Sequence, residues 1–86
     1  MHFVYLLRCS DNSLYCGQTN DINKRIEEHN FSNTKSAKYT KGRRPVELVY
    51  MEKYKTLSHA LKREHKIKMF TKKQKEKLIL KKVALL

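Results

Sequence analysis

The chain has 86 residues, and its 20 lysine and arginine side chains against 8 acidic side chains give a formal net charge of +12. This length excludes a second domain, and a content of two glycines and one proline excludes a flexible linker or a collagen-like chain. The longest apolar runs have four to five residues, whereas a membrane-spanning helix needs roughly 20. Only Met1 and His2 precede the first apolar run, which leaves no room for a secretory signal, so we expect a cytoplasmic protein without a membrane partner.

The first predicted element is a β-hairpin. Phe3–Leu7 and Leu14–Gln18 are rich in β-branched, aromatic and other apolar residues, and turn-forming residues separate the two runs. A two-residue loop would place Tyr5 and Tyr15 on opposite faces of the hairpin. A three-residue loop, Asp11–Ser13, would place the two tyrosines on the same face, and we expect this arrangement.

This register pairs Cys9 with Tyr15. Cys9 and Cys16 are the two cysteines of the chain, and we expect both to be reduced in a cytoplasmic protein. A zinc site would need two further ligands at short spacing, which the sequence around them does not supply. Both are therefore interpreted as half-buried strand residues.

A helix is predicted after the hairpin. Thr19–Asp21 supplies capping side chains, and Ile22, Arg25, Ile26 and His29 follow at helical spacing on one face. Arg25 and His29 therefore share the inward side of this helix.

A polar, basic loop is expected over residues 30–45, with one short turn around Ser36–Thr40. Val46–Met51 is β-branched and apolar and is the third predicted strand. Thr56 can cap the helix that follows.

One face of that helix carries Leu57, Ala60, Leu61, Glu64 and either Ile67 or Lys68 at helical spacing, and its apolar members form a stripe. At about 100° per residue, Glu64 points between Ala60 and Leu61, in the middle of this stripe. Burying an unpaired carboxylate there would cost several kcal/mol, so we expect Glu64 to have a metal ion or Arg25 as its partner.

The last predicted helix covers residues 71–86. Thr71 and Gln74 have the spacing of a capping box, and Val83–Leu86 forms an apolar end.

Positive charge is concentrated in the second part of the chain. Residues 1–34 hold three basic and four acidic side chains, whereas residues 35–86 hold 17 basic and four acidic ones. This distribution favours a polyanionic partner, above all nucleic acid, because lysine and arginine release counterions when they bind phosphates. The alternative is a solvated basic surface that binds nothing. The candidate phosphate contacts are Lys35, Lys38, Lys41, Arg43, Arg44, Lys72, Lys73 and Lys75.

Five side chains stand out chemically: Tyr5, Tyr15, Arg25, His29 and Glu64. Each alone is compatible with a structural role. Together, in a basic chain, they match the needs of phosphodiester hydrolysis, namely a carboxylate for a divalent cation, a cation for the transition-state charge, and a phenol or imidazole to accept a proton.

Several segments resemble the GIY-YIG nuclease superfamily. Phe3–Tyr5 and Tyr15–Gly17 are similar to its paired tripeptide motifs, and Asp21–Asn30 resembles its first helix. Ala37–Pro45 and Ala60–Glu64 are most similar to the small stand-alone bacterial and archaeal members, a group called UPF0213 or YhbQ-like. The resemblance covers about residues 2–75.

This resemblance implies an α+β fold, a three-stranded antiparallel β-sheet flanked by α-helices, in which the five side chains converge. By similarity, Glu64 would hold a single Mg²⁺ or Mn²⁺, and Arg25 would stabilise the pentacovalent phosphate. Tyr15 would be the general base, with His29 as the alternative, and Tyr5 would position a metal-polarised water.

The chain departs from the family pattern at two positions. Phe3 stands where the motif has glycine, and Gln18 stands where excision-repair relatives carry a lysine, which removes any proton-handling role of that lysine. We predict one GIY-YIG endonuclease-like domain over residues 1–86, with its motifs in residues 2–75 and a basic helix at residues 71–86.

The expected function is metal-dependent endonuclease activity on DNA, directed to structured or damaged sites, because 86 residues leave no room for a separate recognition domain. One alternative is a catalytically weak or inactive nucleic-acid-binding protein of the same fold, for DNA or RNA, because phosphate contacts do not identify the sugar. Another is an adaptor that binds a protein partner through Val83–Leu86 of the C-terminal helix.

Overall fold

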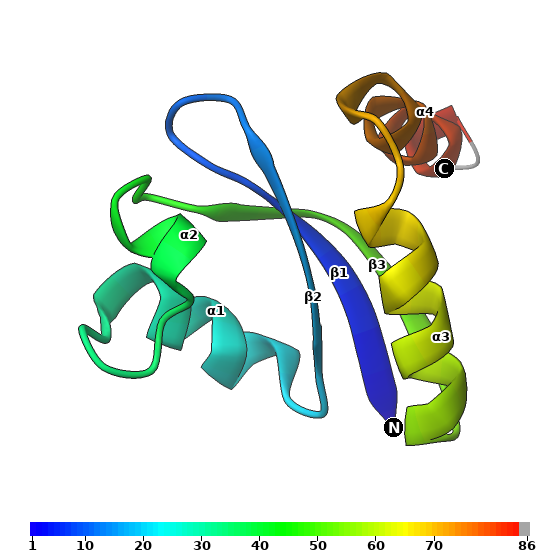
Figure 1. Cartoon of the computed structure of the whole chain (residues 1–86), viewed down its shortest axis with the longest axis horizontal. Coiled ribbons are helices and arrows are strands. Elements are labelled where there is room, and N and C mark those ends of the chain that lie inside the picture. Colours follow the sequence, from blue (N-terminus) through cyan, green and yellow to red (C-terminus); the bar gives the residue numbers. More distant parts are fainter. Residues whose placement is uncertain (85–86) are drawn as a thin grey trace.

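Three strands form one antiparallel sheet in the order β2-β1-β3, so that β1 is central and β2 lies at an edge. The computed structural model describes residues 1–84, and the side chains of residues 1–81. Helices flank the sheet, which confirms the predicted fold class (Figure 1). The elements are β1 His2–Arg8, β2 Leu14–Thr19, α1 Ile22–Phe31, α2 Lys38–Lys41, β3 Glu47–Tyr54, α3 Leu57–Lys68 and α4 Lys72–Ala84.

The hairpin of β1 and β2 has a three-residue loop, but not the predicted one. Leu7, rather than Cys9, is opposite Tyr15, and the Cys9 amide donates to the Ser13 carbonyl at 2.9 Å. The loop residues are therefore 10–12. Asn12 adopts the left-handed conformation (φ 69°) that asparagine tolerates well. Because this shift is two residues, the predicted shared face of Tyr5 and Tyr15 is retained.

Two apolar clusters lie on opposite faces of the sheet. Tyr5, Leu7 and Cys9 pack toward α1, against Ile22 and Ile26. On the other face, Val4, Leu6 and Cys16 pack against residues of α3 and α4, with Ala60, Ile67 and Ile79 at the contact. Figure 1 shows β2 in front of β1, between α1 and α3.

The predicted helix caps are present. The Asp21 carboxylate accepts from the Lys24 amide at 3.1 Å, and the Thr56 hydroxyl accepts from the His59 amide at 3.2 Å. Thr71 and Gln74 form the reciprocal capping box at 2.9 and 3.2 Å. Local side-chain chemistry thus sets where α1, α3 and α4 begin.

The helix α3 is rotated relative to the prediction. Leu57 and Leu61 are 46% and 45% exposed, so they do not belong to the buried stripe, and Glu64 lies at its border rather than in its middle. The reason is Arg63, whose guanidinium binds the Glu52 carboxylate through two bonds of 2.9 and 3.1 Å. This ion pair faces the sheet and turns the leucines outward.

The third strand is longer than predicted and continues to Tyr54. Its polar end is half-buried because Glu52 also accepts hydrogen bonds from the hydroxyls of Tyr50 and Tyr54.

The helix α4 is tied to β1 by a bidentate pair in which Arg8 donates to Glu76 at 2.6 and 2.8 Å. Both cysteines are free, as expected, but they are buried rather than half-buried, and Cys9 follows β1 instead of lying in it. No helix within the described part of the chain is long and apolar enough to cross a membrane. Of the predicted apolar end, Leu85 and Leu86 lie outside the described residues, as do the side chains of Val83 and Ala84.

Candidate active site

A chain of three hydrogen-bonded side chains lies between the sheet and α1. The Tyr5 hydroxyl is 2.9 Å from His29 Nε2, and His29 Nδ1 is 2.8 Å from the Thr40 hydroxyl. Because Thr40 donates its own proton to the Ala37 carbonyl at 3.1 Å, its oxygen accepts from His29 Nδ1–H. His29 Nε2 is then the acceptor for the Tyr5 hydroxyl, and we assign the ring tautomer on this basis.

Tyr5 and His29, the two titratable side chains of this hydrogen-bonded series, are both held neutral near pH 7. Burial raises the pKa of Tyr5 to about 12, and the charge of Glu64 adds to the rise, while the Arg25 guanidinium opposes it. Burial lowers the pKa of His29 to about 4, and the positive charge of Arg25 acts in the same direction. His29 therefore keeps an unprotonated Nε2 toward Tyr5.

Tyr15 lies on the same face as Tyr5, with its ring edge-on to His29 at 5.3 Å between centroids. Tyr39 of α2 stacks on Tyr15 at 5.8 Å between ring centroids, and the Arg43 guanidinium lies over the Tyr39 ring, 4.0 Å from its centroid. Among the side chains that the structure describes, none is hydrogen-bonded to the Tyr15 hydroxyl. The ring is thus fixed by stacking, and its hydroxyl is left available.

Arg25 projects from α1 and is three-quarters buried. It pairs with Glu28 at 3.1 Å and donates to the Lys35 carbonyl at 2.6 Å, so its partner is not Glu64. Its effect on the pKa of Tyr5 shows that the guanidinium lies near that hydroxyl. Arg25, Tyr5, Tyr15 and His29 are therefore brought together on the α1 side of the sheet.

Gly17 is directly opposite Tyr5 in the hairpin. A Cβ atom at this position would lie 2.5 Å from Tyr5 Cζ and closer still to the hydroxyl oxygen. The Tyr5 ring thus crosses over Gly17, and the absence of a side chain there brings the phenol toward the outer edge of the sheet.

Glu64 approaches from the other side of β2. Its helix packs on the opposite face, where Cys16 Sγ contacts the Glu64 carbonyl at 3.9 Å. The Glu64 side chain is 18% exposed, and Lys68 is its ion-pair partner at 3.6 Å. Four of the five predicted residues thus share one face of the sheet, whereas Glu64 belongs to the helix on the opposite face.

The side chains at this site could hold a divalent cation only through a single carboxylate. No group of three or more histidine, cysteine or acidic side chains among the described residues could hold a metal ion. Mg²⁺ is often bound by one or two carboxylates together with water and substrate phosphate. Glu64 offers one such carboxylate, 18% exposed.

The predicted phosphate contacts fall into two groups. Arg43 donates to Asp11 and to the Tyr39 carbonyl, at 3.1 and 2.8 Å, and Arg44 donates to the carbonyls of His29 and Ser32, so both guanidinium groups have internal partners. The lysines are different: five are exposed and the sixth, Lys75, is half-buried, and the exposed ones are Lys35, Lys38, Lys41, Lys72 and Lys73.

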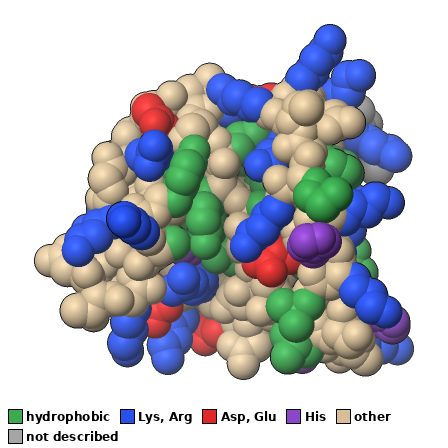
Figure 2. Space-filling view, in the orientation of Figure 1, with side chains coloured by type: hydrophobic (Ala, Val, Ile, Leu, Met, Phe, Trp, Pro, Cys, Tyr) green, Lys and Arg blue, Asp and Glu red, His purple; other side chains and the backbone are tan. Residues whose placement is uncertain are grey.

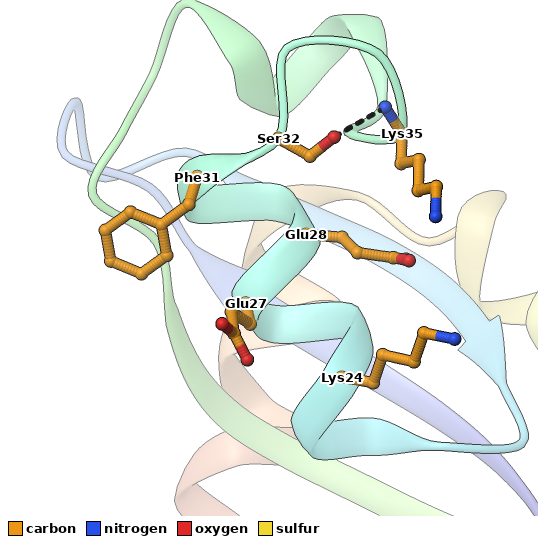
Figure 3. A pocket seen from close by; sticks show the side chains of 6 residues that line it. All are labelled: Lys24, Glu27, Glu28, Phe31, Ser32 and Lys35. Carbon is orange, nitrogen blue, oxygen red and sulfur yellow. Dashed lines mark hydrogen bonds between the residues drawn. The ribbon is translucent and has the colours of Figure 1, made fainter.

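Lys35 borders a pocket of about 430 Å³ on α1. Figure 3 shows Lys24, Glu28 and Lys35 pointing to the same side of this helix, while Phe31 points away. Figure 2 shows the face of the molecule on which β2 lies. Basic side chains gather over α1 and α2 on one side of this face and over α3 and α4 on the other, and acidic side chains lie between the two groups.

Two residues near the site were not predicted. Thr40 is fully buried and fixes the His29 tautomer, and Tyr39 supports Tyr15. Both lie in the basic segment interpreted as a loop. Because Gly42 and Pro45 interrupt this segment, it has no helical or strand periodicity. The one signal of a packing role was Tyr39, an aromatic residue in an otherwise polar stretch.

Comparisons with known proteins agree with this geometry. The family model of the GIY-YIG catalytic domain matches residues 1–77. A UPF0213 protein from Staphylococcus epidermidis is 59% identical over 78 residues, which are 91% of this chain and 93% of that protein, and one from Staphylococcus aureus is 56% identical over the same shares.

Two solution NMR structures are also similar. A protein from E. faecalis is 41% identical, with a TM-score of 0.64 and coverage of 99% of this chain and 88% of that one. A UPF0213 protein from Bacillus halodurans is 38% identical, with a TM-score of 0.58 and coverage of 91% and 81%. The chain therefore belongs to the GIY-YIG family, and among its relatives are the UPF0213 proteins.

Proposed function

We propose that this protein is a divalent-metal-dependent endonuclease that hydrolyses phosphodiester bonds in DNA at structured or damaged sites. The observation that carries the proposal is the hydrogen-bonded chain from Tyr5 through His29 to Thr40, beside the guanidinium of Arg25. A tyrosine kept only for packing needs no buried, tautomer-fixed imidazole at its hydroxyl.

Tyr5 is the residue that orients the attacking water. Its proton is donated to His29 Nε2, so its oxygen is left to accept a hydrogen bond from a water molecule. His29 is not the direct base, because both ring nitrogens are engaged and its pKa is lowered to about 4. Tyr15, whose hydroxyl has no internal partner among the described side chains, acts as the base in its phenolate form: it first releases its own proton to solvent and then takes the proton of that water.

Arg25 stabilises the charge that develops on the phosphate in the transition state. Glu64 would hold Mg²⁺ or Mn²⁺, which supplies Lewis-acid polarisation of the phosphate. Because Glu64 and Tyr5 lie on opposite faces of β2, the scissile phosphate is expected at the outer edge of that strand, next to Gly17.

Nicking of supercoiled plasmid DNA with Mg²⁺ or Mn²⁺ tests the proposal. Glu64→Gln keeps the side-chain volume and removes the charge, so we expect it to abolish nicking while DNA affinity, measured by fluorescence anisotropy, changes by no more than a few fold. Glu47→Gln, at an exposed position of β3, is the matched control and should nick as the wild type does.

Equal nicking by wild type and Glu64→Gln would remove Glu64 from the site. Tight DNA or RNA binding by the wild type without nicking in either metal would favour the nucleic-acid-binding alternative.

A further inference from the structure

A second pocket of about 430 Å³ lies where β2 ends, between the starts of α1 and α3. We propose that it binds one unpaired nucleotide of the substrate strand next to the cleaved phosphate, and that side-chain amides recognise its base. This inference rests on the proposed nuclease function and specifies its substrate. The lining residues are His2, Gln18, Thr19, Asn20, Arg25 and Leu57.

The polar part of the lining has the chemistry of base recognition. Gln18 and Asn20 carry amides, each with two donor hydrogens and an acceptor oxygen, and neither amide has a hydrogen-bond partner among the described residues. The Thr19 hydroxyl is already used, because it accepts from the Asp21 amide at 3.1 Å and donates to the Asp21 carbonyl. Asparagine and glutamine amides pair naturally with the edges of nucleobases, adenine above all.

The pocket also provides an apolar wall. Leu57 is 46% exposed, although it begins a helix whose other side is packed on the sheet. Figure 2 shows hydrophobic atoms at the surface between β2 and α3 on this face. His2 lies beside it with a buried Nδ1 that no described group satisfies, so nothing polar fixes that nitrogen. An aliphatic side chain and an imidazole ring suit the flat face of a base.

Charge and position link the pocket to the reacting phosphate. The lining contains no carboxylate, and its one permanently charged group is Arg25, which also lies near the Tyr5 hydroxyl. When a phosphate of the DNA strand contacts Arg25, the nucleotide next to that phosphate would therefore lie at the pocket. The volume is in the range of small-ligand sites, so it suits a single nucleotide and not a base pair.

A base can enter such a pocket only when it is unpaired, as at a flap, a gap or a damaged site. The pocket thus gives a physical reason for structure-directed cleavage.

Cleavage mapping on a flap substrate with randomised nucleotides at the junction tests the inference. Wild type should prefer one base at a position adjacent to the cut, and Asn20→Ala should lower the rate at that base by about tenfold, to the level of the other bases, since one good base contact contributes about 1–3 kcal/mol. Asn23→Ala, at an exposed position of α1 outside the pocket, should keep the wild-type preference.

A binding experiment separates this inference from the proposed function. In ¹H–¹⁵N NMR spectra of the wild type, nucleoside monophosphates should shift the side-chain amide signals of Gln18 and Asn20 more than inorganic phosphate does, whether or not the protein cleaves DNA. Amide shifts without any nicking would support the pocket and overturn the nuclease proposal. Cleavage without base preference, or equal shifts with inorganic phosphate, would overturn the pocket.

Discussion

At the level of single residues, the site depends on a contact between a phenol and a glycine. The ring of Tyr5 can reach the outer edge of the sheet because Gly17, opposite it, has no side chain. The hydroxyl then meets His29, whose other nitrogen is fixed by Thr40. Each of these groups is buried, so small changes in volume or protonation should be transmitted to the site.

Gly17→Ala should displace Tyr5, because the new methyl group would lie 2.5 Å from Tyr5 Cζ. We expect loss of the Tyr5 to His29 hydrogen bond, at least a tenfold fall in nicking rate, and a loss of stability of about 1–3 kcal/mol in urea denaturation. Gly42→Ala is the control, because no described atom beyond the adjacent residues lies within 4 Å of the added methyl group. Wild-type nicking by Gly17→Ala would show that Tyr5 is not needed at that place.

His29 should make the fold sensitive to acid. Its pKa is lowered to about 4 in the folded protein, whereas the unfolded chain has a pKa of about 6.5, so the unfolded state binds more protons between these values. Stability is therefore fully present above pH 6.5 and lost as the pH falls toward 4, by about 2 kcal/mol at pH 5.

Urea denaturation at pH 7 and pH 5 measures this loss. The difference between the two pH values should shrink by about 2 kcal/mol in His29→Gln and stay unchanged in His65→Gln, which alters an exposed histidine. An unchanged difference in His29→Gln would mean that the imidazole is not kept neutral by the fold.

At the level of elements, sequence patterns predicted the features that are set by residues close together in the sequence. Helix caps at Asp21, Thr56 and Thr71 act over three residues, and the alternation of the hairpin is equally local. The rotation of α3 and the extension of β3 depend on the pair of Glu52 and Arg63, eleven residues apart, and could not be predicted from either segment alone. The same limit applies to the site, where the contact of His29 with Thr40 is set by the packing of α2.

The short helix α2 stabilises the position of Tyr15 from outside. Tyr39→Ala removes the stacked ring, and we expect a stability loss of about 1 kcal/mol and a several-fold fall in the rate of nicking at saturating DNA, without a change in DNA affinity. Tyr39→Phe keeps the ring and should behave as the wild type. Weaker DNA binding by Tyr39→Ala, with an unchanged rate, would instead make Tyr39 a DNA contact.

At the level of the whole molecule, the net charge of +12 should appear as a strong salt dependence of binding. Because Arg43 and Arg44 have internal partners, six of the predicted contacts are left, all of them lysines. Six phosphate contacts would lower the affinity for duplex DNA by about three decades between 50 and 200 mM salt, at a slope of about −0.9 per contact.

Charge reversal tests whether α4 contributes to that slope. Replacing Lys72, Lys73 and Lys75 with glutamate should flatten it by up to about three units, similarly for all DNA sequences, because phosphate contacts carry no base information. Charge reversal of Lys53 and Lys55, at the opposite edge of the sheet, should have a smaller effect per residue. An unchanged slope in the α4 variant would leave the binding to Lys35, Lys38 and Lys41.

Because β2 lies at the edge of the sheet, it could pair with a strand of another copy of this protein. An unpaired strand edge is a template for intermolecular β-pairing, and proteins commonly block it with a covering element, a proline or a charge. Here a covering element would also block Tyr5 and Glu64, which flank that strand. Mutual repulsion between molecules with a net charge of +12 disfavours such pairing, so we expect this charge to protect the free protein from aggregation.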